Sequence, residues 1–267
     1  IKHELHCIGS YRNPELLRMS KSYGVCAMDD VDSIVSFAKQ IRPDLCIIGP
    51  EKPLAAGVVD SLKAAGYMRC IGPNESIARL ESDKGWCRDF LDLYGLGAYS
   101  PQYRIFGSFA SAGPPQNDWT RIGKDGRYRK LKKWNEISNQ VEEHMKQLDG
   151  AYVIKPVGLR GGKGVKVSGD HLKSIKEGIE YCHQLYVEEH AFVIEEKLVG
   201  KEFSLISLSD GRECAHFPVA TDFKRAYDGD EGPNTGGMGC LTYSKDDLPE
   251  WLSVEILQEA KRLTAQV

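Results

Sequence analysis

The fold is decided by one stretch of the sequence, Lys155-Pro156-Val157-Gly158-Leu159-Arg160-Gly161-Gly162-Lys163-Gly164-Val165. Residues 151–155 are mostly apolar and predict a strand that leads into the glycines, and Val165 begins a second strand. A hairpin with glycines at its tip and lysines at both ends can fold over a polyphosphate, because it offers backbone N–H groups and positive charge. It is not a Walker A loop, since Gly164 stands where that motif has Ser or Thr.

A second informative stretch covers residues 192–204. A strand is expected from Phe192 to Glu196, so that it ends in two carboxylates, and Glu202 follows after a short connection. This spacing places acceptors for an exocyclic amine and for ribose hydroxyls about one nucleoside apart. Glu-Glu-Lys is also common at protein surfaces. The inference of a nucleoside site therefore depends on its position after the glycine hairpin.

Residues 230–239 contain four glycines and one proline, which suits neither a helix nor a central strand. Few side chains cover the backbone there, so its N–H groups can approach an anion or a small substrate, and Asn234 and Thr235 add directed hydrogen bonds. A surface turn is the alternative interpretation of such a segment. The three stretches together favour a cradle for a ligand.

The N-terminal third alternates helix and strand patterns. Apolar residues recur at helical spacing from Ile34 to Ile41, and a second helix is expected from Leu54 to Ala65. Short apolar runs predict strands at 5–8, 25–28, 44–48 and 68–71. This alternation indicates a doubly wound parallel α/β domain, in which ligands bind near the loops 49–54 and 72–74 after the strands. No Gly-x-Gly-x-x-Gly follows the first strand, which disfavours a dinucleotide ligand.

The middle of the chain is less regular. One helix is expected with Trp86, Phe90 and Leu93 on its apolar face, and another with its stripe between Ile137 and Leu148. Between them, residues 107–134 carry a basic run and little periodicity. We interpret them as a solvated loop, with a nucleic-acid contact as the alternative.

The composition bounds the class of protein. The 267 residues are 41% hydrophobic and 27% charged, which is typical of a globular protein with a sizeable core. A net charge of -3 and a pI near 6.2 offer no global field for nucleic acid or an anionic membrane, so small-molecule partners are expected. Eight cysteines without a Cys-x-x-Cys pair indicate reduced core thiols in a cytoplasmic protein. No apolar run is long enough to span a membrane.

Taken in order, these motifs resemble the phosphoribosylamine-glycine ligases, also called glycinamide ribonucleotide synthetases, of the ATP-grasp superfamily. The matching motifs lie at residues 49–57, 81–84, 155–165, 194–204 and 222–239. They cover nearly the whole chain, and the last, Asp222-x-Lys224-Arg225 through Gly239, is specific to this family among ATP-grasp enzymes. The form Lys-Pro-Val-Gly-Leu at 155–159 resembles the archaeal branch.

The resemblance implies the architecture of the chain. An N-terminal doubly wound parallel α/β domain is expected over residues 1–82. An ATP-grasp domain of α+β type with a glycine-rich lid hairpin is expected over residues 83–267, with the lid subdomain at about 100–194. The family's Mg²⁺ ligands are expected beyond Val267, so the resemblance predicts no metal ligand within the chain and a truncation at both ends.

The resemblance also implies roles for individual residues. ATP would be bound by Lys84, Lys155, Gly161, Gly162, Lys163, Gly164, Val165, Glu195, Glu196, Lys197, Leu198 and Glu202. The substrates would be bound by Glu51, Pro53, Leu54, Gly57, Asp222, Lys224, Arg225, Pro233, Asn234, Thr235, Gly236, Gly237 and Met238. The catalytic residues would be Asp222, Lys224 and Arg225.

The implied reaction uses ATP to convert glycine into glycyl phosphate, which the amine of 5-phosphoribosylamine attacks to give glycinamide ribonucleotide, ADP and phosphate. Two positions depart from the family. Phe223 stands in place of a histidine, and Arg160 stands where the hairpin usually has a small or hydroxyl residue. They leave open an ATP-grasp ligase with another substrate, and the expected absence of metal ligands leaves open a nucleotide-binding fragment without catalysis.

Overall fold

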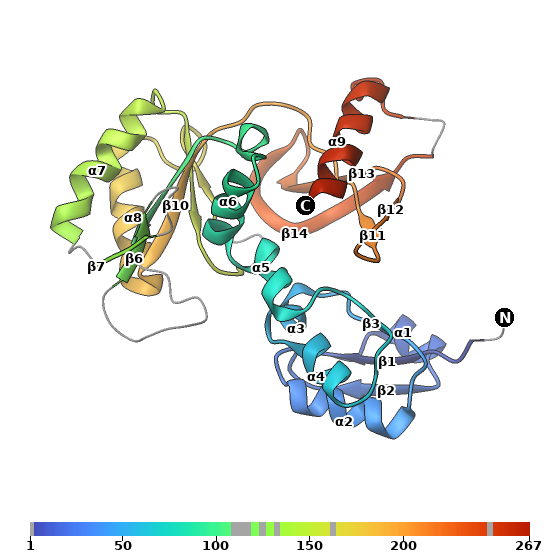
Figure 1. Cartoon of the computed structure of the whole chain (residues 1–267). Helices are drawn as coiled ribbons and strands as arrows, with labels where there is room; N and C mark the ends of the chain where they lie inside the picture. The colour runs from blue at the N-terminus through green and yellow to red at the C-terminus, as the bar shows by residue number, and fades with distance from the viewer. Residues whose placement is uncertain (1–2, 108–118, 123–126, 131–133, 161–163, 245–247) are drawn as a thin grey trace. The chain divides into compact units, whose positions relative to one another are not determined.

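The computed structural model describes residues 3–107, 119–122, 127–130, 134–160, 164–244 and 248–267. The chain divides into two compact units, Ile1–Cys87 and Arg88–Val267. In Figure 1 the first unit is coloured blue to cyan, and the second unit runs from green to red.

The first unit combines parallel strand pairs with short helices. Its strands are β1 (His6–Gly9), β2 (Ser22–Val25), β3 (Cys46–Ile47) and β4 (Cys70–Ile71), with β1 parallel to β2 and β3 parallel to β4. Its helices are α1 (Pro14–Met19), α2 (Val31–Ile41), α3 (Glu51–Ala55), α4 (Val58–Ala64) and α5 (Glu75–Ser82). The predicted alternation of helices with parallel strands is therefore confirmed.

The core of the first unit lies between α2 and α4. Ile34 and Ala38 of α2 pack with Val58, Val59 and Leu62 of α4, and none of these side chains is more than 7% exposed. This cluster explains why α2 forms where the apolar residues recur at helical spacing.

Two predictions for the first unit were wrong in detail. The helix expected from Leu54 to Ala65 is broken into α3 and α4, because Gly57 adopts a left-handed conformation with φ 77° between them. The strand expected at 25–28 is shifted to β2 at Ser22–Val25. Gly24 lies opposite Ile8 in the ladder, where a Cβ would come within 3.1 Å of Ile8, so this position favours glycine. Because β2 contains glycine and polar residues, its sequence shows no apolar run by which the strand could be predicted.

The second unit is built on an antiparallel sheet with strand order β5-β10-β8-β9. These strands are β5 (Tyr103–Gly107), β10 (Ala191–Glu196), β8 (Tyr152–Pro156) and β9 (Lys166–Val167). The predicted hairpin is thus present in the ladder, because β8 and β9 pair with each other on either side of the glycines.

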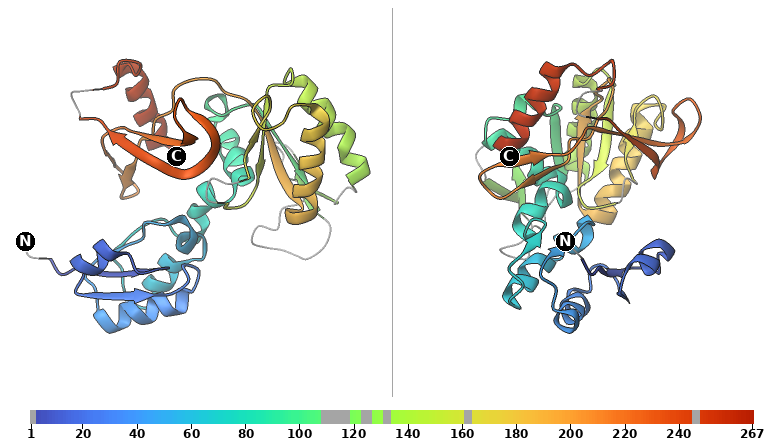
Figure 2. Two further views of the ribbon diagram at one scale, coloured as in Figure 1. Left: turned by 180° about the vertical axis from the view of Figure 1, so that it is seen from behind. Right: turned by 90° about the vertical axis from the view of Figure 1, so that its right-hand side faces the viewer.

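Helices α7 (Trp134–Gln147) and α8 (Ile175–Glu189) cover one face of this sheet, as Figure 1 and the left view of Figure 2 show. Side chains alternate between the two faces of a strand, so Phe192 and Ile194 of β10 point into the helix-covered core. Phe192 is fully buried and stacks on Phe106 of β5 with ring centroids 5.4 Å apart.

The other face of the sheet carries Val193 and Glu195, and helix α6 (Lys84–Leu93) lies on that side. The hydroxyl of Tyr103 in β5 lies 2.9 Å from an oxygen of Asp92 and 3.2 Å from an oxygen of Asp89, so its one proton is shared between them and holds the second half of α6 against the sheet.

Residues 231–239 of the glycine-rich segment belong to a strand that the sequence did not predict, although it is not a central strand. β14 (Glu231–Thr242) pairs antiparallel with β13 (Ala220–Tyr227), in a two-stranded sheet. The pairing is irregular, because Phe223 lies opposite Gly239 but Arg225 lies opposite Asn234. Residues 235–238 therefore form a bulge opposite Lys224, and this bulge retains the loop-like backbone that the glycines predict.

The remaining described elements are mostly short. They are the 3-10 helix at Gly97–Tyr99, β6 (Trp119–Ile122), β7 (Arg127–Lys130), β11 (Ser207–Ser209) and β12 (Cys214–His216), together with the longer helix α9 (Val254–Gln266). β6 and β7 pair antiparallel, so the solvated loop predicted at 107–134 is wrong where the structure describes it. Trp, Thr and Ile are residue types that favour strands, a signal that the basic run obscured in the sequence.

The described cysteines are all free, and Cys182 is buried, but Cys240 is exposed and so lies outside any core. No helix in the described part of the chain combines the length and the apolarity that a membrane crossing needs.

Candidate active site

The centre of the candidate site is a carboxylate with two cations. Glu195 of β10 is 1% exposed, and its Oε2 accepts from Lys155 Nζ of β8 at 2.5 Å. Its Oε1 accepts from Arg88 Nε of α6 at 2.8 Å. The register places Lys155 opposite Val193, so Lys155 and Glu195 are diagonal neighbours on the face of the sheet away from α7 and α8.

The ionisation of Glu195 follows from these contacts. Burial alone raises the pKa of its carboxyl, but the hydrogen bond with Arg88 and the charge of Lys155 outweigh burial and hold the pKa below its usual value of 4.5. Glu195 is therefore a buried anion at neutral pH. Lys155, whose side chain is 25% exposed, remains reachable from outside.

Both described arms of the glycine hairpin are attached to α8. Tyr181 donates its hydroxyl proton to the carbonyl oxygen of Gly164 at 2.6 Å. On the other arm, Arg160 forms ion pairs with Glu188 and Glu189 near the end of α8. The charge that Arg160 adds to the hairpin is thus already paired. Gly161, Gly162 and Lys163 lie outside the described residues.

The connection after β10 leads from Glu196 to Glu202. Glu196 Oε1 accepts from the backbone N–H of Gln102 at 2.9 Å, and Leu198 is 68% exposed. Glu202 accepts from Lys224 Nζ at 3.2 Å, and Asp222 lies 3.4 Å from the same nitrogen. The structure therefore brings one predicted nucleotide residue, Glu202, together with two predicted catalytic residues.

The charge of Lys224 is stabilised by this grouping. Burial lowers the pKa of its amine, but Glu202 and Asp222 outweigh burial and raise the pKa above the usual value of 10.5. Lys224 is therefore a fixed cation on β13, beside the bulge of β14.

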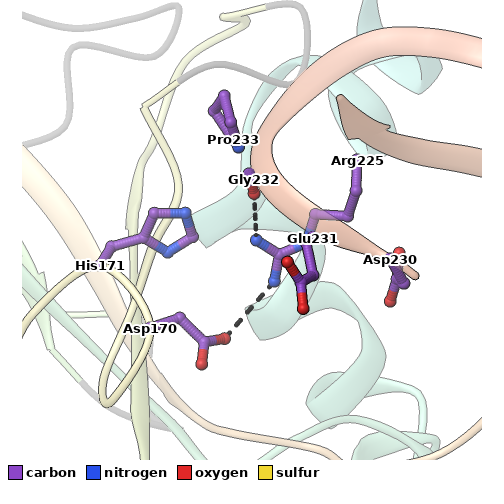
Figure 3. Close-up of a pocket in the computed structure, with 7 residues that line it drawn as sticks. All are labelled: Asp170, His171, Arg225, Asp230, Glu231, Gly232 and Pro233. Carbon is purple, nitrogen blue, oxygen red and sulfur yellow. Dashed lines mark hydrogen bonds and ion pairs between the residues drawn. The ribbon is translucent and has the colours of Figure 1, made fainter. Parts of the chain in front are cut away.

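A cavity of about 440 Å³ lies beside Arg225 (Figure 3). It is lined by Asp170, His171, Arg225, Asp230, Glu231, Gly232 and Pro233. Arg225 donates to the carbonyl oxygen of Gly232 at 2.6 Å, and its Nη2 lies 3.5 Å from Asp170. His171 Nδ1 accepts from the backbone N–H of Val167 at 3.2 Å, so the neutral ring carries its proton on Nε2.

The bulge of β14 has its own support. Thr235 donates its hydroxyl proton to the carbonyl oxygen of Lys224 at 2.9 Å and accepts from the N–H of Gly237 at 3.1 Å. Gly237 has a φ of 120°, which a side chain would disfavour. Pro233, Asn234 and the glycines around Met238 are thus held on one strand with Arg225 opposite.

Sequence reasoning missed several residues of these groupings, among them Arg88, Asp170 and His171. Asp170 lies 3.6 Å from Lys197 Nζ as well as 3.5 Å from Arg225, and so bridges the connection after β10 and strand β13. The sequence offers only a weak signal for them, the turn-forming Gly169-Asp170 pair and a basic residue in a helix.

The other predicted site residues belong to the first unit. Glu51, Pro53 and Leu54 form α3, Pro53 is buried, and Gly57 separates α3 from α4. Lys84 is the first residue of α6. Their roles in binding stay predictions.

Comparison with known proteins adds an independent line of evidence. The family model "Phosphoribosylglycinamide synthetase, ATP-grasp (A) domain" matches residues 121–265, and the model of the N domain of the same enzyme matches residues 3–81. The phosphoribosylamine-glycine ligase of Pyrococcus abyssi is 36% identical over 246 residues, which are 92% of this chain and 49% of that relative.

Solved structures show the same fold. The phosphoribosylamine-glycine ligase from Thermotoga maritima aligns with a TM-score of 0.65 at 20% identity, over 98% of this chain and 59% of that chain. An N5-carboxyaminoimidazole ribonucleotide synthetase, solved as an ADP complex, aligns with a TM-score of 0.60 at 16% identity, over 98% of this chain and 56% of that chain.

The antiparallel sheet with its glycine hairpin and the paired Lys155 and Glu195 define an ATP-grasp domain, preceded by an α/β unit. The chain belongs to the phosphoribosylglycinamide synthetase family. It spans about half the length of the curated relatives that it matches.

Proposed function

We propose that the protein is a phosphoribosylamine-glycine ligase, which uses ATP to join glycine to 5-phosphoribosylamine and releases ADP and phosphate. The observation that carries the proposal is the cation Lys155 beside the buried Glu195, next to the exposed connection that leads to Glu202 and Lys224. Because the chain belongs to this family, the arrangement supports a nucleotide site beside Lys155 and a substrate site beside Lys224, both in the second unit.

The described residues fit a nucleotide. Lys155 is reachable and would bind a phosphate, while the backbone around Leu198 and the 80% exposed carboxylate of Glu202 would bind adenine and ribose. Gly164 and Val165, on the described arm of the hairpin, would add phosphate contacts within the same unit. ATP would supply the phosphoryl group that makes the carboxylate of glycine an electrophile.

The substrate side of the site would be formed by β13 and β14. Lys224 and Arg225 offer positive charge, and Arg225 can hold a phosphate or an acyl phosphate with two parallel hydrogen bonds. The bulge at 235–238 would add backbone donors, and Asp222 would accept from an amine. Cations and donors at fixed positions can bring two negatively charged reactants together, which water alone does not.

The described residues do not fit a resident Mg²⁺ site. Among them, no group of three or more His, Cys, Asp or Glu side chains gathers to hold a metal ion. Asp170, His171, Asp230 and Glu231 all line the Arg225 cavity, but no three of these described side chains gather closely enough to hold a metal ion. We therefore derive no step of the reaction through Mg²⁺.

The nucleotide part of the proposal is tested by calorimetry of ADP binding. Lys155→Ala removes the charge proposed to meet the phosphates, and an ion pair at 4 Å is worth between about 1 kcal/mol in water and about 4 kcal/mol at an effective dielectric of 20. We expect ADP affinity to fall at least about fivefold, which corresponds to about 1 kcal/mol. Lys176→Ala removes an 85% exposed charge from α8 and should change affinity less than about twofold. Equal effects would contradict the assignment of Lys155.

The reaction itself is tested in the protein at its full natural length. ADP release should require both glycine and phosphoribosylamine. One observation favours a second candidate, an ATP-grasp ligase with another acid or amine, because Phe223 presents a 50% exposed ring on β13 next to Asp222 and Lys224. ADP release that does not depend on glycine would support that second candidate.

A further inference from the structure

We propose that Arg88 is a positioning residue that keeps the carboxylate of Glu195 ionised and oriented while Lys155 turns from Glu195 to the phosphates of a bound nucleotide. The proposal rests on the nucleotide site proposed above. It concerns a residue of α6 that has no assigned role in nucleotide binding, and it explains why a buried carboxylate stands beside a phosphate-binding lysine.

The geometry divides the carboxylate between two cations. Oε1 of Glu195 accepts from Arg88 Nε at 2.8 Å, and Oε2 accepts from Lys155 Nζ at 2.5 Å. The side chain of Glu195 is 2% exposed, whereas those of Arg88 and Lys155 are 20% and 25% exposed. Water therefore cannot replace either partner of the carboxylate easily, but Lys155 can reach a ligand.

The balance of charges requires Arg88 to keep Glu195 paired when Lys155 moves to the phosphate. One carboxylate and two cations leave a single surplus positive charge, which is available to a phosphate. When Lys155 moves to the phosphate, Arg88 still pairs with the buried carboxylate. Without Arg88, the same movement would leave an unpaired buried anion, which is far less stable than a paired one.

The fold holds Arg88 in place independently of any ligand. The following turn of α6 is attached to β5, because Asp89 and Asp92 share the hydroxyl proton of Tyr103. Tyr103 is the neighbour of Glu195 in the ladder, so the same strand pair fixes both the helix and the carboxylate. The charged groups that face Glu195 in the described structure are thus Arg88 from α6 and Lys155 from β8.

The proposal predicts how many protons the protein takes up when it binds ADP. In an Arg88→Gln variant, ADP would draw Lys155 away and Glu195 would take up one proton from the buffer, becoming a neutral carboxylic acid. ADP binding by that variant would then strengthen as the pH falls. The unchanged protein would bind ADP without this uptake, since Arg88 keeps Glu195 ionised. A side chain with a purely structural role would not alter the number of protons bound.

The experiment is calorimetry of ADP binding to the 267-residue chain at pH 7 in PIPES and in imidazole, two phosphate-free buffers whose heats of ionisation differ and so report proton uptake. We expect Arg88→Gln to bind ADP at least about tenfold more weakly, with uptake approaching one proton per ADP. Arg88→Lys should restore most of the affinity and abolish the uptake. Arg104→Gln is the matched control, because Arg104 is a partly buried arginine that bonds Gln140 and lies over Phe106 on the opposite face.

Each outcome decides the question. Wild-type affinity without proton uptake in Arg88→Gln would overturn the proposal. Proton uptake by the unchanged protein would overturn it too, and that measurement does not depend on any variant folding. Adding Glu195→Gln to Arg88→Gln should remove the uptake, and its persistence would show that another group takes the proton. No ADP binding by the unchanged protein would instead contradict the proposed nucleotide site.

Discussion

Carboxylates determine where the cations of the second unit point. Asp170 orients Lys197 and Arg225, and Glu202 orients Lys224. These pairs are partly exposed, so each contributes about 1 kcal/mol or less to stability, and their main effect is on geometry. Glu195 differs, because its pairs are buried and removing one partner leaves a costly charge.

Burial has the largest effect on the charge of His144, the charge of Arg104 adds to it, and hydrogen bonds with Ile194 and Gln147 oppose it. The balance gives a prediction about pH. His144 of α7 is 9% exposed beside Phe106, and burial lowers its pKa below the usual value of 6.5. In the unfolded chain His144 therefore takes up a proton near pH 6.5, whereas in the folded chain it takes up that proton only at a lower pH. The stability contributed by the neutral ring is fully present above pH 6.5 and is lost as the pH falls toward the folded pKa.

We expect denaturant unfolding to show a loss of up to about 1.4 kcal/mol per pH unit below pH 6.5 that disappears in His144→Gln. His183→Gln, an exposed histidine on α8, is the control and should leave the pH slope of the unfolding free energy unchanged. The same slope in His144→Gln and in the unchanged protein would show that other groups cause the pH dependence.

The ion pairs of single residues also show what sequence patterns could not predict. The sequence suggested Lys155 and Glu195 as ligand residues but not their ion pair, because 40 residues separate them and neither lies in a pattern that specifies the other. Arg88 lies 107 residues from Glu195, and its helical pattern shows an apolar face without indicating which cation reaches a carboxylate. Which of these residues bind ligands stays a prediction.

Elements were predicted well where burial and periodicity coincide. α2, α7 and β10 each bury the apolar residues that their patterns marked, such as Ile34, Val141 and Ile194. Backbone conformation was harder, since the apolar spacing continues across Gly57 although the helix breaks there. The glycines of β14 indicated an open backbone, but glycine content does not report the irregular register in which β14 pairs with β13, the strand just before it.

The bulge of β14 offers a test of how an element serves the substrate side. Thr235→Val keeps the size of the side chain and removes the hydroxyl that joins Lys224 O to Gly237 N–H. We expect ADP affinity within about twofold and, in the protein at its full natural length, a loss of turnover of about tenfold, the equivalent of one hydrogen bond or a little more. Steady-state kinetics and calorimetry measure the two effects separately.

Thr242→Val is the control for that experiment, because Thr242 lies on the same strand, opposite Ala220 and away from the bulge. It should leave turnover nearly unchanged. A loss of ADP affinity in Thr235→Val equal to its loss of turnover would place the bulge at the nucleotide instead of the substrates.

The two compact units have separate hydrophobic cores. Leu62 of α4 is 1% exposed in the cluster of the first unit, and Leu185 of α8 is 2% exposed in the cluster that covers the sheet of the second unit. Most proposed nucleotide contacts, from Lys155 to Glu202, belong to the second unit. Nucleotide should therefore stabilise that unit directly, because a ligand stabilises the structure that binds it.

Hydrogen exchange with a matched pair of variants checks this division. Leu62→Ala and Leu185→Ala should each destabilise by about 2 to 5 kcal/mol, since each leaves a cavity in a packed core. We expect Leu62→Ala to speed exchange in α2 and α4, and Leu185→Ala to speed it in α7 and α8. ADP at a hundred times its dissociation constant adds about 2.7 kcal/mol to the state that binds it, and should slow exchange in α7 and α8 of Leu185→Ala. Equal protection of α2 and α4 in Leu62→Ala would show instead that the two cores unfold together, because a ligand protects every segment whose opening requires its release.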